Sequence, residues 1–421
     1  MHILIQQARI TDPNSSLNGK ICDVLIENGI ITQIKEKIPV PQGAETFSAL
    51  NLHVSPGWFD MQANFRDPGF EYKEDIESGS AAAASGGFTG VALMPSTQPP
   101  IHSKSEVEYI KNKTRGALVD VFPVGTLSHQ HEGKELSEMY DMYQSGAIAF
   151  SDDKKPVKNA GLLVRALLYA KNFNSLIMTH CEEQSLSQDG KMNESITSTQ
   201  LGLKGMPALA EEVMLARNIQ LAEYADSGIH FCSISTAGSV HLIREAKNKG
   251  LKVSASVNAH HLGLDDTRLG DFDANLKVNP PLRDMQDIAA LRKGLADGTI
   301  DVISSDHSPE DTENKVLEFD HAAFGMLGLE TAFALANTYS GLSTEQLVLK
   351  LSIQPRSLLG LEVPVIKEGN KANLTLFDPE LAWTFSGKDI RSKSKNTPFI
   401  GTSFKGKALG IFNNGHLRLN S

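Results

Sequence analysis

Cysteine is scarce in this sequence of 421 residues. The three cysteines, Cys22, Cys181 and Cys232, lie far apart in the chain, and no two of them form a CxxC pair. This spacing excludes a disulfide framework and a cysteine zinc site. It is typical of buried free thiols in a reducing cytoplasm, where we expect the protein to be located.

Long apolar runs and excess basic charge are also missing. The first segment, MHILIQQARITDP, becomes polar by Gln6, so we expect neither a signal peptide nor a membrane anchor. The 40 Lys and Arg residues are outnumbered by 50 Asp and Glu residues, which gives a formal net charge of −10. Because an acidic surface repels phosphate backbones and anionic lipids, we expect no nucleic acid and no membrane among the partners.

What the sequence does contain is an alternation of short β-branched segments with stretches of helical periodicity. Strands are predicted at residues 58–62, 90–94, 119–124, 147–150, 176–179, 230–234, 252–257 and 302–305. Helices are predicted between them, for example at 105–114, 160–171, 208–225, 239–249 and 285–296. Eight such repeats indicate an α/β fold with a closed (β/α)8 barrel. An open doubly wound sheet is the alternative, but no GxGxxG follows the first strand to support it.

The two ends of the chain have a different sequence pattern, in which short strands are separated by turn signals. Short strands are predicted at 3–5, 24–26 and 30–34, and again at 372–377 and 408–412. Turn signals between them, such as Asn-Asn-Gly before His416, indicate hairpins. We therefore predict one composite β-domain from residues 1–55 and 362–421, outside a barrel formed by residues 56–361.

Motifs follow the predicted strands in a definite order. They are PGWFDMQANFRDPG (56–69), ASGGFTGVALMPSTQP (84–99), AFSDDKKPV (149–157), HCEE (180–183), STAGSV (235–240), NLKVNPPLR (275–283), SSDHSP (304–309), FGMLGLET (324–331) and SKSKNTPFIG (392–401). From Met1 to the end of the chain, this set resembles the bacterial class I dihydroorotases. The resemblance implies an amidohydrolase barrel that interconverts carbamoyl-aspartate and dihydroorotate at a zinc centre in pyrimidine biosynthesis.

Three positions depart from the metal-binding pattern that the resemblance implies. Gln62 and Asn64 stand where active relatives have the two histidines of HxH, and Ser233 stands where a further histidine is expected. Amide and hydroxyl oxygens are weak substitutes for imidazole at zinc.

The resemblance assigns the remaining metal positions to Asp153, His180 and Asp306, and Asp306 is also the ancestral catalytic residue. Two carboxylates and one imidazole could hold one ion loosely. They would not hold the metal pair that activates water. We therefore expect no cofactor, with zinc as the metal if any activity remains.

The residues that the resemblance implies for substrate binding also depart from the family pattern. Arg66 matches the arginine that grips the substrate carboxylate in the family, but Ser96 replaces an asparagine and Glu310 replaces a histidine of that site. An added anion beside an anionic ligand repels it. We predict that the Glu310 carboxylate has taken the place of the substrate and pairs with Arg66.

Several histidines, and Asp306 itself, can also be interpreted as purely structural residues. Asp306 and His307 could form a strand end with a hydrogen-bonded histidine, and the pair His260-His261 is interpreted as packing. His129-Gln130-His131 recreates an HxH pattern, and on an extended segment both rings could face one replacement ion. The polar character of that loop favours a solvated segment instead.

These departures predict a dihydroorotase homologue without activity, which acts as a structural or regulatory partner of aspartate carbamoyltransferase. The family contains noncatalytic members that assemble with that enzyme. We expect a homo-oligomer or a hetero-oligomer. The alternatives are an active dihydroorotase, or another cyclic-amide hydrolase, with a reduced or relocated metal site, and a ligand sensor that kept only the cavity.

Overall fold

Eight short parallel strands form a closed barrel in this computed structural model, which describes residues 2–420. The barrel strands are β6 (Trp58–Ala63), β7 (Phe88–Leu93), β8 (Asp120–Pro123), β9 (Ala149–Phe150), β10 (Leu176–Thr179), β13 (Ile229–Phe231), β14 (Val253–Asn258) and β15 (Val302–Ser304). Parallel bridges from Gly125 to Phe150 and from Ala63 to His307 join the two halves of the barrel. Each strand overlaps a predicted one, so the predicted barrel is confirmed and the open sheet is not formed.

Helices surround the barrel, and the longer ones follow the predicted periodicity. They are α1 (Ile76–Ser85), α2 (Lys104–Lys113), α3 (Met139–Ser145), α4 (Ala160–Lys171), α7 (Ala208–Ala225), α8 (Ala237–Asn248), α9 (Met285–Ala296), α11 (Ala332–Tyr339), α12 (Thr344–Val348) and α13 (Gln354–Leu358), with a π-helical turn at Leu349–Ile353 before α13. Shorter elements lie in the connecting loops: α5 (Gln184–Ser187), α6 (Ile196–Leu201), α10 (Thr312–Lys315), β11 (Met192–Asn193), β12 (Gly205–Met206), and 3₁₀ turns at His129–His131, Ala259–Leu262, Asp266–Asp271 and Ala274–Leu276.

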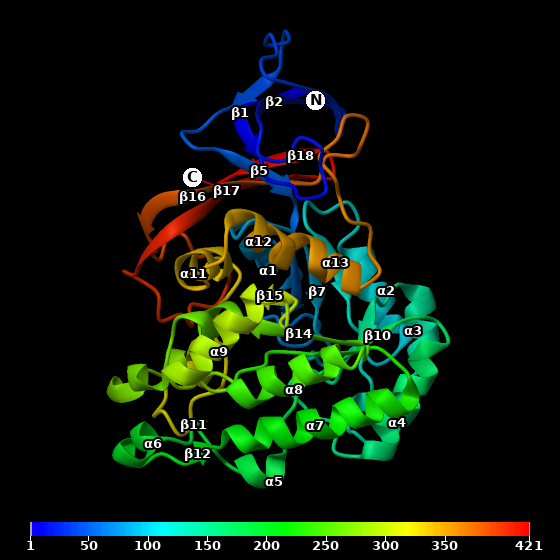
Figure 1. Cartoon of the computed structure of the whole chain (residues 1–421), viewed down its shortest axis with the longest axis vertical. Coiled ribbons are helices and arrows are strands. Elements are labelled where there is room, and N and C mark those ends of the chain that lie inside the picture. The colour runs from blue at the N-terminus through cyan, green and yellow to red at the C-terminus, as the bar shows by residue number, and fades with distance from the viewer. Residues whose placement is uncertain (1, 421) are drawn as a thin grey trace.

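Strands from both ends of the chain share one further sheet, at the top of Figure 1. Its order is β18 (His416–Leu419), β17 (Ser403–Asn413), β16 (Leu374–Thr384), β5 (His53–Pro56), β1 (His2–Ile10), β2 (Ile21–Glu27) and β3 (Ile30–Lys35), and β4 (Glu45–Phe47) pairs with β1. A separate apolar cluster with Ile5, Val24 and Leu376 packs this sheet. A small β-domain built from both termini is therefore present, and its boundaries at 55 and 362 stay a prediction.

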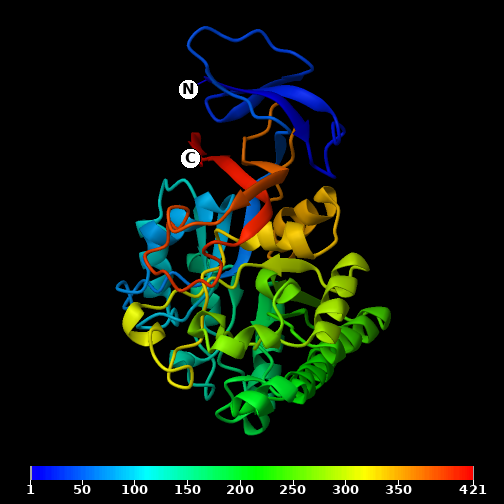
Figure 2. The same cartoon turned by 90° about the vertical axis from the view of Figure 1, so that its left-hand side faces the viewer.

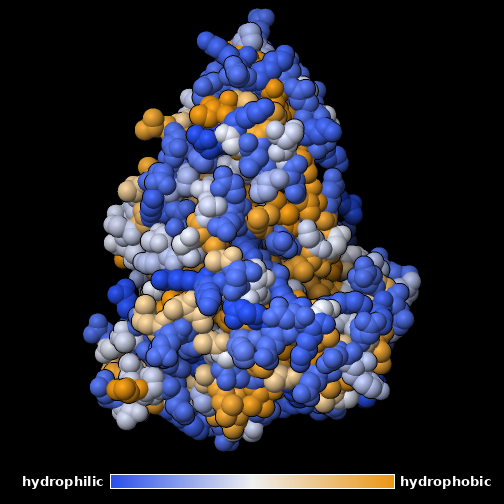
Figure 3. Space-filling view, in the orientation of Figure 1, coloured by the Kyte–Doolittle hydropathy of each residue, from blue (hydrophilic) through white to orange (hydrophobic). Residues whose placement is uncertain are grey.

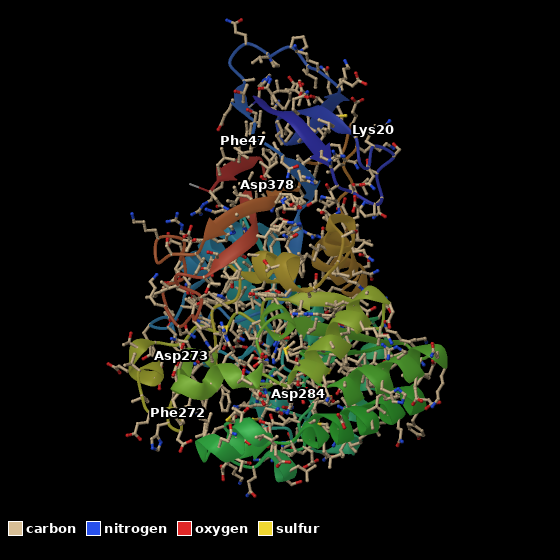
Figure 4. The ribbon with its side chains drawn as sticks, turned by 60° about the vertical axis from the view of Figure 1, so that its left-hand side comes forward. Lys20, Phe47, Phe272, Asp273, Asp284 and Asp378 are labelled. Atoms are coloured by element: carbon tan, nitrogen blue, oxygen red, sulfur yellow. The ribbon has the colours of Figure 1, made fainter. Side chains whose placement is uncertain are left out.

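The two parts lie at opposite ends of the molecule (Figures 1 and 2). Lys20 and Phe47 in the β-domain are far from Phe272 and Asp273, which belong to the loop after β14 (Figure 4). The face of the molecule in Figure 3 is mostly hydrophilic, with scattered hydrophobic patches. Within residues 2–420, no helix has both the length and the apolar character needed to cross a bilayer.

Candidate functional site

Polar side chains gather where the barrel strands end, the position at which barrels of this kind carry their chemistry. The backbone of four of these residues is left-handed: φ is 61° at Arg66, 47° at Asp153, 55° at Ser233 and 50° at Asp306. Non-glycine residues rarely adopt this conformation, which persists where the surrounding structure enforces it and is enriched at functional sites. Four of the predicted site residues therefore share an unusual local geometry.

A closed ring of hydrogen bonds links four of these strand ends. Gln62 and Asn258 each donate an amide N–H to Asp306, to Oδ1 and Oδ2 respectively, both over 2.9 Å. The Ser233 hydroxyl lies 2.9 Å from Gln62 Oε1 and 2.8 Å from Asn258 Oδ1. All four side chains are buried. Gln62 therefore binds the Asp306 carboxylate directly, and Ser233 joins the same network through Gln62 and Asn258.

The Lys154 ammonium group enters this ring from the loop after β9. Its Nζ lies 2.9 Å from Asp306 Oδ1 and 2.7 Å from the carbonyl oxygen of Asn279. Burial raises the pKa of Asp306, and the Lys154 charge opposes that rise. Lys154 was not among the predicted site residues, although it directly follows Asp153 in the motif AFSDDKKPV.

Asp153 and His180 lie at the ends of the neighbouring strands. Ser96 donates to Asp153 Oδ2 over 2.6 Å, and His180 Nε2 lies 3.4 Å from Glu182 Oε2. Burial disfavours the Glu182 carboxylate, but hydrogen bonds from His180, Ser187 and Asn279 lower its pKa to about 2. Beside this cluster lies an open cleft of about 690 Å³, whose lining includes Glu182 and Asn279.

Three buried atoms of the site have no hydrogen-bond partner: Asn64 Oδ1, Asp153 Oδ1 and His180 Nδ1. They are the remaining candidates for metal ligands, since both oxygens of Asp306 are occupied by Gln62, Asn258 and Lys154. Among residues 2–420, no three His, Cys, Asp or Glu side chains are arranged as a metal site. Asp306, the third member of the loose facial set expected with Asp153 and His180, faces amide and ammonium donors. The amide and hydroxyl oxygens at Gln62, Asn64 and Ser233 are weak donors for zinc, so this set of side chains is a poor match to a zinc pair.

The predicted pair between Arg66 and Glu310 is present. Arg66 Nη2 lies 2.8 Å from Glu310 Oε1, and the same guanidinium donates to Ser308 Oγ over 2.9 Å and to the carbonyl of Pro309 over 3.2 Å. A second cation that the sequence did not suggest, Lys73, lies 2.6 Å from Glu310 Oε2. The Glu310 side chain is 6% exposed, so its carboxylate is buried between two cations.

Buried polar contacts hold the last strand end in place. The backbone N–H groups of Gly328 and Leu329 point at His307 Nδ1 over 3.3 and 3.4 Å, which leaves its Nε2–H to face Glu74. His307 is thus a hydrogen-bonded histidine at a strand end, as one interpretation of the sequence held. Asp60 accepts the backbone N–H of Ser305, and burial raises its pKa to about 6.

Among residues 2–420, the other histidine motifs belong to no group of three His, Cys, Asp or Glu side chains that could hold a metal ion. His129 is exposed and contacts the ring of His102, whereas His131 is buried. Gln130 and His131 both have positive φ, so the segment is a turn and its rings do not share one face as on a strand. His260 and His261 are buried, and His261 contacts the carbonyls of Pro280 and Pro281, in agreement with a packing role.

The fold belongs to the class of amidohydrolase barrels that carry a small β-domain. It is similar to an L-hydantoinase (dihydropyrimidinase) from Arthrobacter aurescens, with a TM-score of 0.87 and 22% identity over 100% of this chain and 97% of that chain. It is also similar to a D-hydantoinase (dihydropyrimidinase) from Thermus sp., with a TM-score of 0.84 and 23% identity over 99% and 95%. At these identities the likeness defines the fold alone.

Sequence comparison gives the family. The profile described as "Dihydro-orotase-like" matches residues 52–239. The chain is 44% identical over 413 residues to a dihydroorotase of Trichlorobacter lovleyi and to one of Pelobacter propionicus, covering 97% of each chain. It is 43% identical over 420 residues to a dihydroorotase of Acetivibrio thermocellus, covering 99% of this chain and 98% of that relative. The chain therefore belongs to the dihydroorotase family.

Proposed function

We propose that this member of the dihydroorotase family has lost the hydrolytic chemistry and serves pyrimidine biosynthesis as a structural or regulatory protein. The observation that supports this most directly is the state of Asp306, whose two oxygens face three donors from Gln62, Asn258 and Lys154. A carboxylate that is committed in this way is poorly placed to accept a proton from water. The donor set also lacks the ligands that lower the pKa of water from 15.7 to about 7 at zinc.

The substrate side supports the same proposal. Arg66 would bind a substrate carboxylate in an active relative, but here it already shares the Glu310 carboxylate with Lys73. An entering dicarboxylate would have to displace Glu310 and leave it buried without its cations. The desolvation of such an unpaired charge is strongly unfavourable.

For the partner we propose aspartate carbamoyltransferase, bound through outer barrel surface away from the site. The resemblance supplies this candidate, because noncatalytic members of the family assemble with that enzyme. The support in this chain is a contrast between scaffold and site. The barrel and the β-domain are complete, whereas three histidine positions hold other residues, as expected if selection has acted on shape.

Elemental analysis and a cyclisation assay on the full chain, purified without chelator, test the loss of activity. We expect substoichiometric zinc and no conversion of carbamoyl-aspartate to dihydroorotate, because Gln62, Asn64 and Ser233 cannot replace imidazole ligands. The Trichlorobacter lovleyi relative, treated in the same way, serves as the control. Stoichiometric zinc together with turnover that Asp306→Ala abolishes would contradict the proposal.

A second candidate function is hydrolysis with a reduced metal site. It is favoured by the three unpartnered buried atoms, Asn64 Oδ1, Asp153 Oδ1 and His180 Nδ1, which could together face one ion. In that case added zinc should produce turnover that the double change Asp153→Asn and His180→Gln removes. If zinc titrated up to millimolar concentration yields no turnover, this candidate is eliminated.

A further inference from the structure

Lys154 places a positive charge beside two of the positions that the family resemblance assigns to metal ligands, Asp306 and Ser233. Its side chain comes from the loop after β9 and reaches residues that follow three other strands or their loops: Asp306 at 2.9 Å, the Asn279 carbonyl at 2.7 Å and Ser233 Oγ at 3.5 Å. An ammonium group has three N–H donors and no acceptor. Three oxygens thus surround the three donors.

The partners of this ammonium group are oriented to receive it. The single hydroxyl hydrogen of Ser233 can be donated to either Gln62 Oε1 or Asn258 Oδ1, and in both cases the oxygen lone pairs are free to accept from Lys154. Gln62 and Asn258 in turn present their amide N–H groups to Asp306. The direction of each bond in the ring is consistent with a cation at the position of Nζ.

Lys154 is the charged partner of the buried Asp306 carboxylate, whereas Gln62 and Asn258 are neutral partners. The Asp306 side chain is 5% exposed, and its other partners, Gln62 and Asn258, are neutral amides. Among the ion pairs of residues 2–420 that include Asp306, the cation is Lys154. A buried carboxylate without a cation is costly, and the charge must be compensated or neutralised.

We propose that the Lys154 ammonium is the resident cation of this centre and occupies the place that a metal ion has in the family. The inference rests on the proposed function, because it requires that the residues present do not hold a zinc pair. It goes further, since it assigns the compensating charge to one side chain of the chain itself. The Asp306 carboxylate is then charge-compensated without a metal ion.

A pair of variants tests this assignment in the full chain by thermal unfolding. Lys154→Ala should lower the unfolding midpoint by about 5 °C, because it leaves Asp306 buried and unpaired. Lys155→Ala, which alters the exposed neighbouring lysine, should leave the midpoint unchanged. Propylammonium chloride should restore the midpoint of Lys154→Ala, since it supplies the missing atoms of the lysine side chain, and propanol or sodium chloride at equal concentration should not. The Lys154 side chain is 25% exposed, so a small cation can reach the site.

A double-variant cycle keeps the test decisive if Lys154→Ala fails to fold. In an Asp306→Asn background the carboxylate charge is gone, so Lys154→Met should shift the midpoint much less than it does in the unmodified chain. Equal shifts in both backgrounds, or a Lys154→Ala variant as stable as Lys155→Ala, would overturn the assignment. These readouts do not depend on turnover. If the unmodified chain were to convert carbamoyl-aspartate while the cycle still showed coupling, only the proposed function would fail.

Discussion

Gln62 and Ser233 stand where the resemblance to dihydroorotases implies histidines, and both join one hydrogen-bond network. Gln62 contacts Asp306 and Ser233 contacts Asn258, in each case at the end of an adjacent strand. An imidazole that lost its metal would leave an unpaired nitrogen in a buried site, whereas an amide and a hydroxyl satisfy the carboxylate and one another. Asn64 does not join the network, and its Oδ1 remains without a partner.

Removing the Glu310 carboxylate should destabilise the fold by about 3 kcal/mol, because it leaves Arg66 largely buried without an anion and leaves Lys73 with Asp311, 4.0 Å away, as its remaining anion. The exposed side-chain fractions of these two cations are 13% and 15%. Urea unfolding of Glu310→Ala measures the loss, and Glu318→Ala, at an exposed glutamate, is the control. A loss of less than about 1 kcal/mol would show that solvent screens the pair.

At the scale of elements, the sequence predicted the scaffold well. The bounds of α4, α7 and α9 coincide with the predicted helices, because hydrophobic periodicity over a dozen residues is a strong local signal. The barrel strands were found from a different signal, since most are short buried apolar segments that are followed by a motif. At the site, the sequence predicted only those contacts that follow from the charges and motif positions of the residues themselves. Arg66 and Glu310 carry opposite charges on two motifs, so their pairing could be predicted, whereas the reach of Lys154 and Lys73 depends on side-chain conformations that no local pattern determines.

The contact between β13 and β14 makes a prediction about acid stability. His230 on β13 contacts Ser254 Oγ on β14 over 2.9 Å, and burial lowers its pKa to about 3. The unfolded chain binds a proton there below about pH 6.5, whereas the folded chain does so only near pH 3. The stability that the neutral ring contributes is therefore complete above pH 6.5 and falls by about 1.4 kcal/mol per pH unit below it.

His230→Asn should remove this contribution to the pH dependence. The slope of unfolding free energy against pH, measured in urea between pH 6 and pH 4.5, should fall by about 1.4 kcal/mol per pH unit relative to the unmodified chain. The control is His241→Asn on α8, where the side chain is 67% exposed. An unchanged slope in His230→Asn would mean that the buried ring takes up its proton in the folded state.

For the whole molecule, scaffold and site differ in how far they follow the family. The chain aligns with dihydroorotases over 97% of its length, and the barrel and the β-domain are both complete. At the site, the cations Lys154, Arg66 and Lys73 contact carboxylates of the chain itself. Because these cations are already paired within the chain, they have little electrostatic need of an anionic substrate. Under the proposed function, the outer surface is the part of the molecule on which selection for a partner would act.

Assembly with aspartate carbamoyltransferase is the prediction that belongs to this scale. Co-expression with the aspartate carbamoyltransferase of the same organism should give one peak in size-exclusion chromatography at micromolar concentration. The complex should persist in chelator, because the proposed contact lies on the outer barrel and needs no metal. Asn64→Ala is the matched control, since Asn64 is buried and its Oδ1 has no partner, so this change should leave the elution volume unaltered. Two separate peaks would eliminate this partner, and a complex that Asn64→Ala or chelator dissolves would place the contact at the site and contradict a role for the scaffold alone.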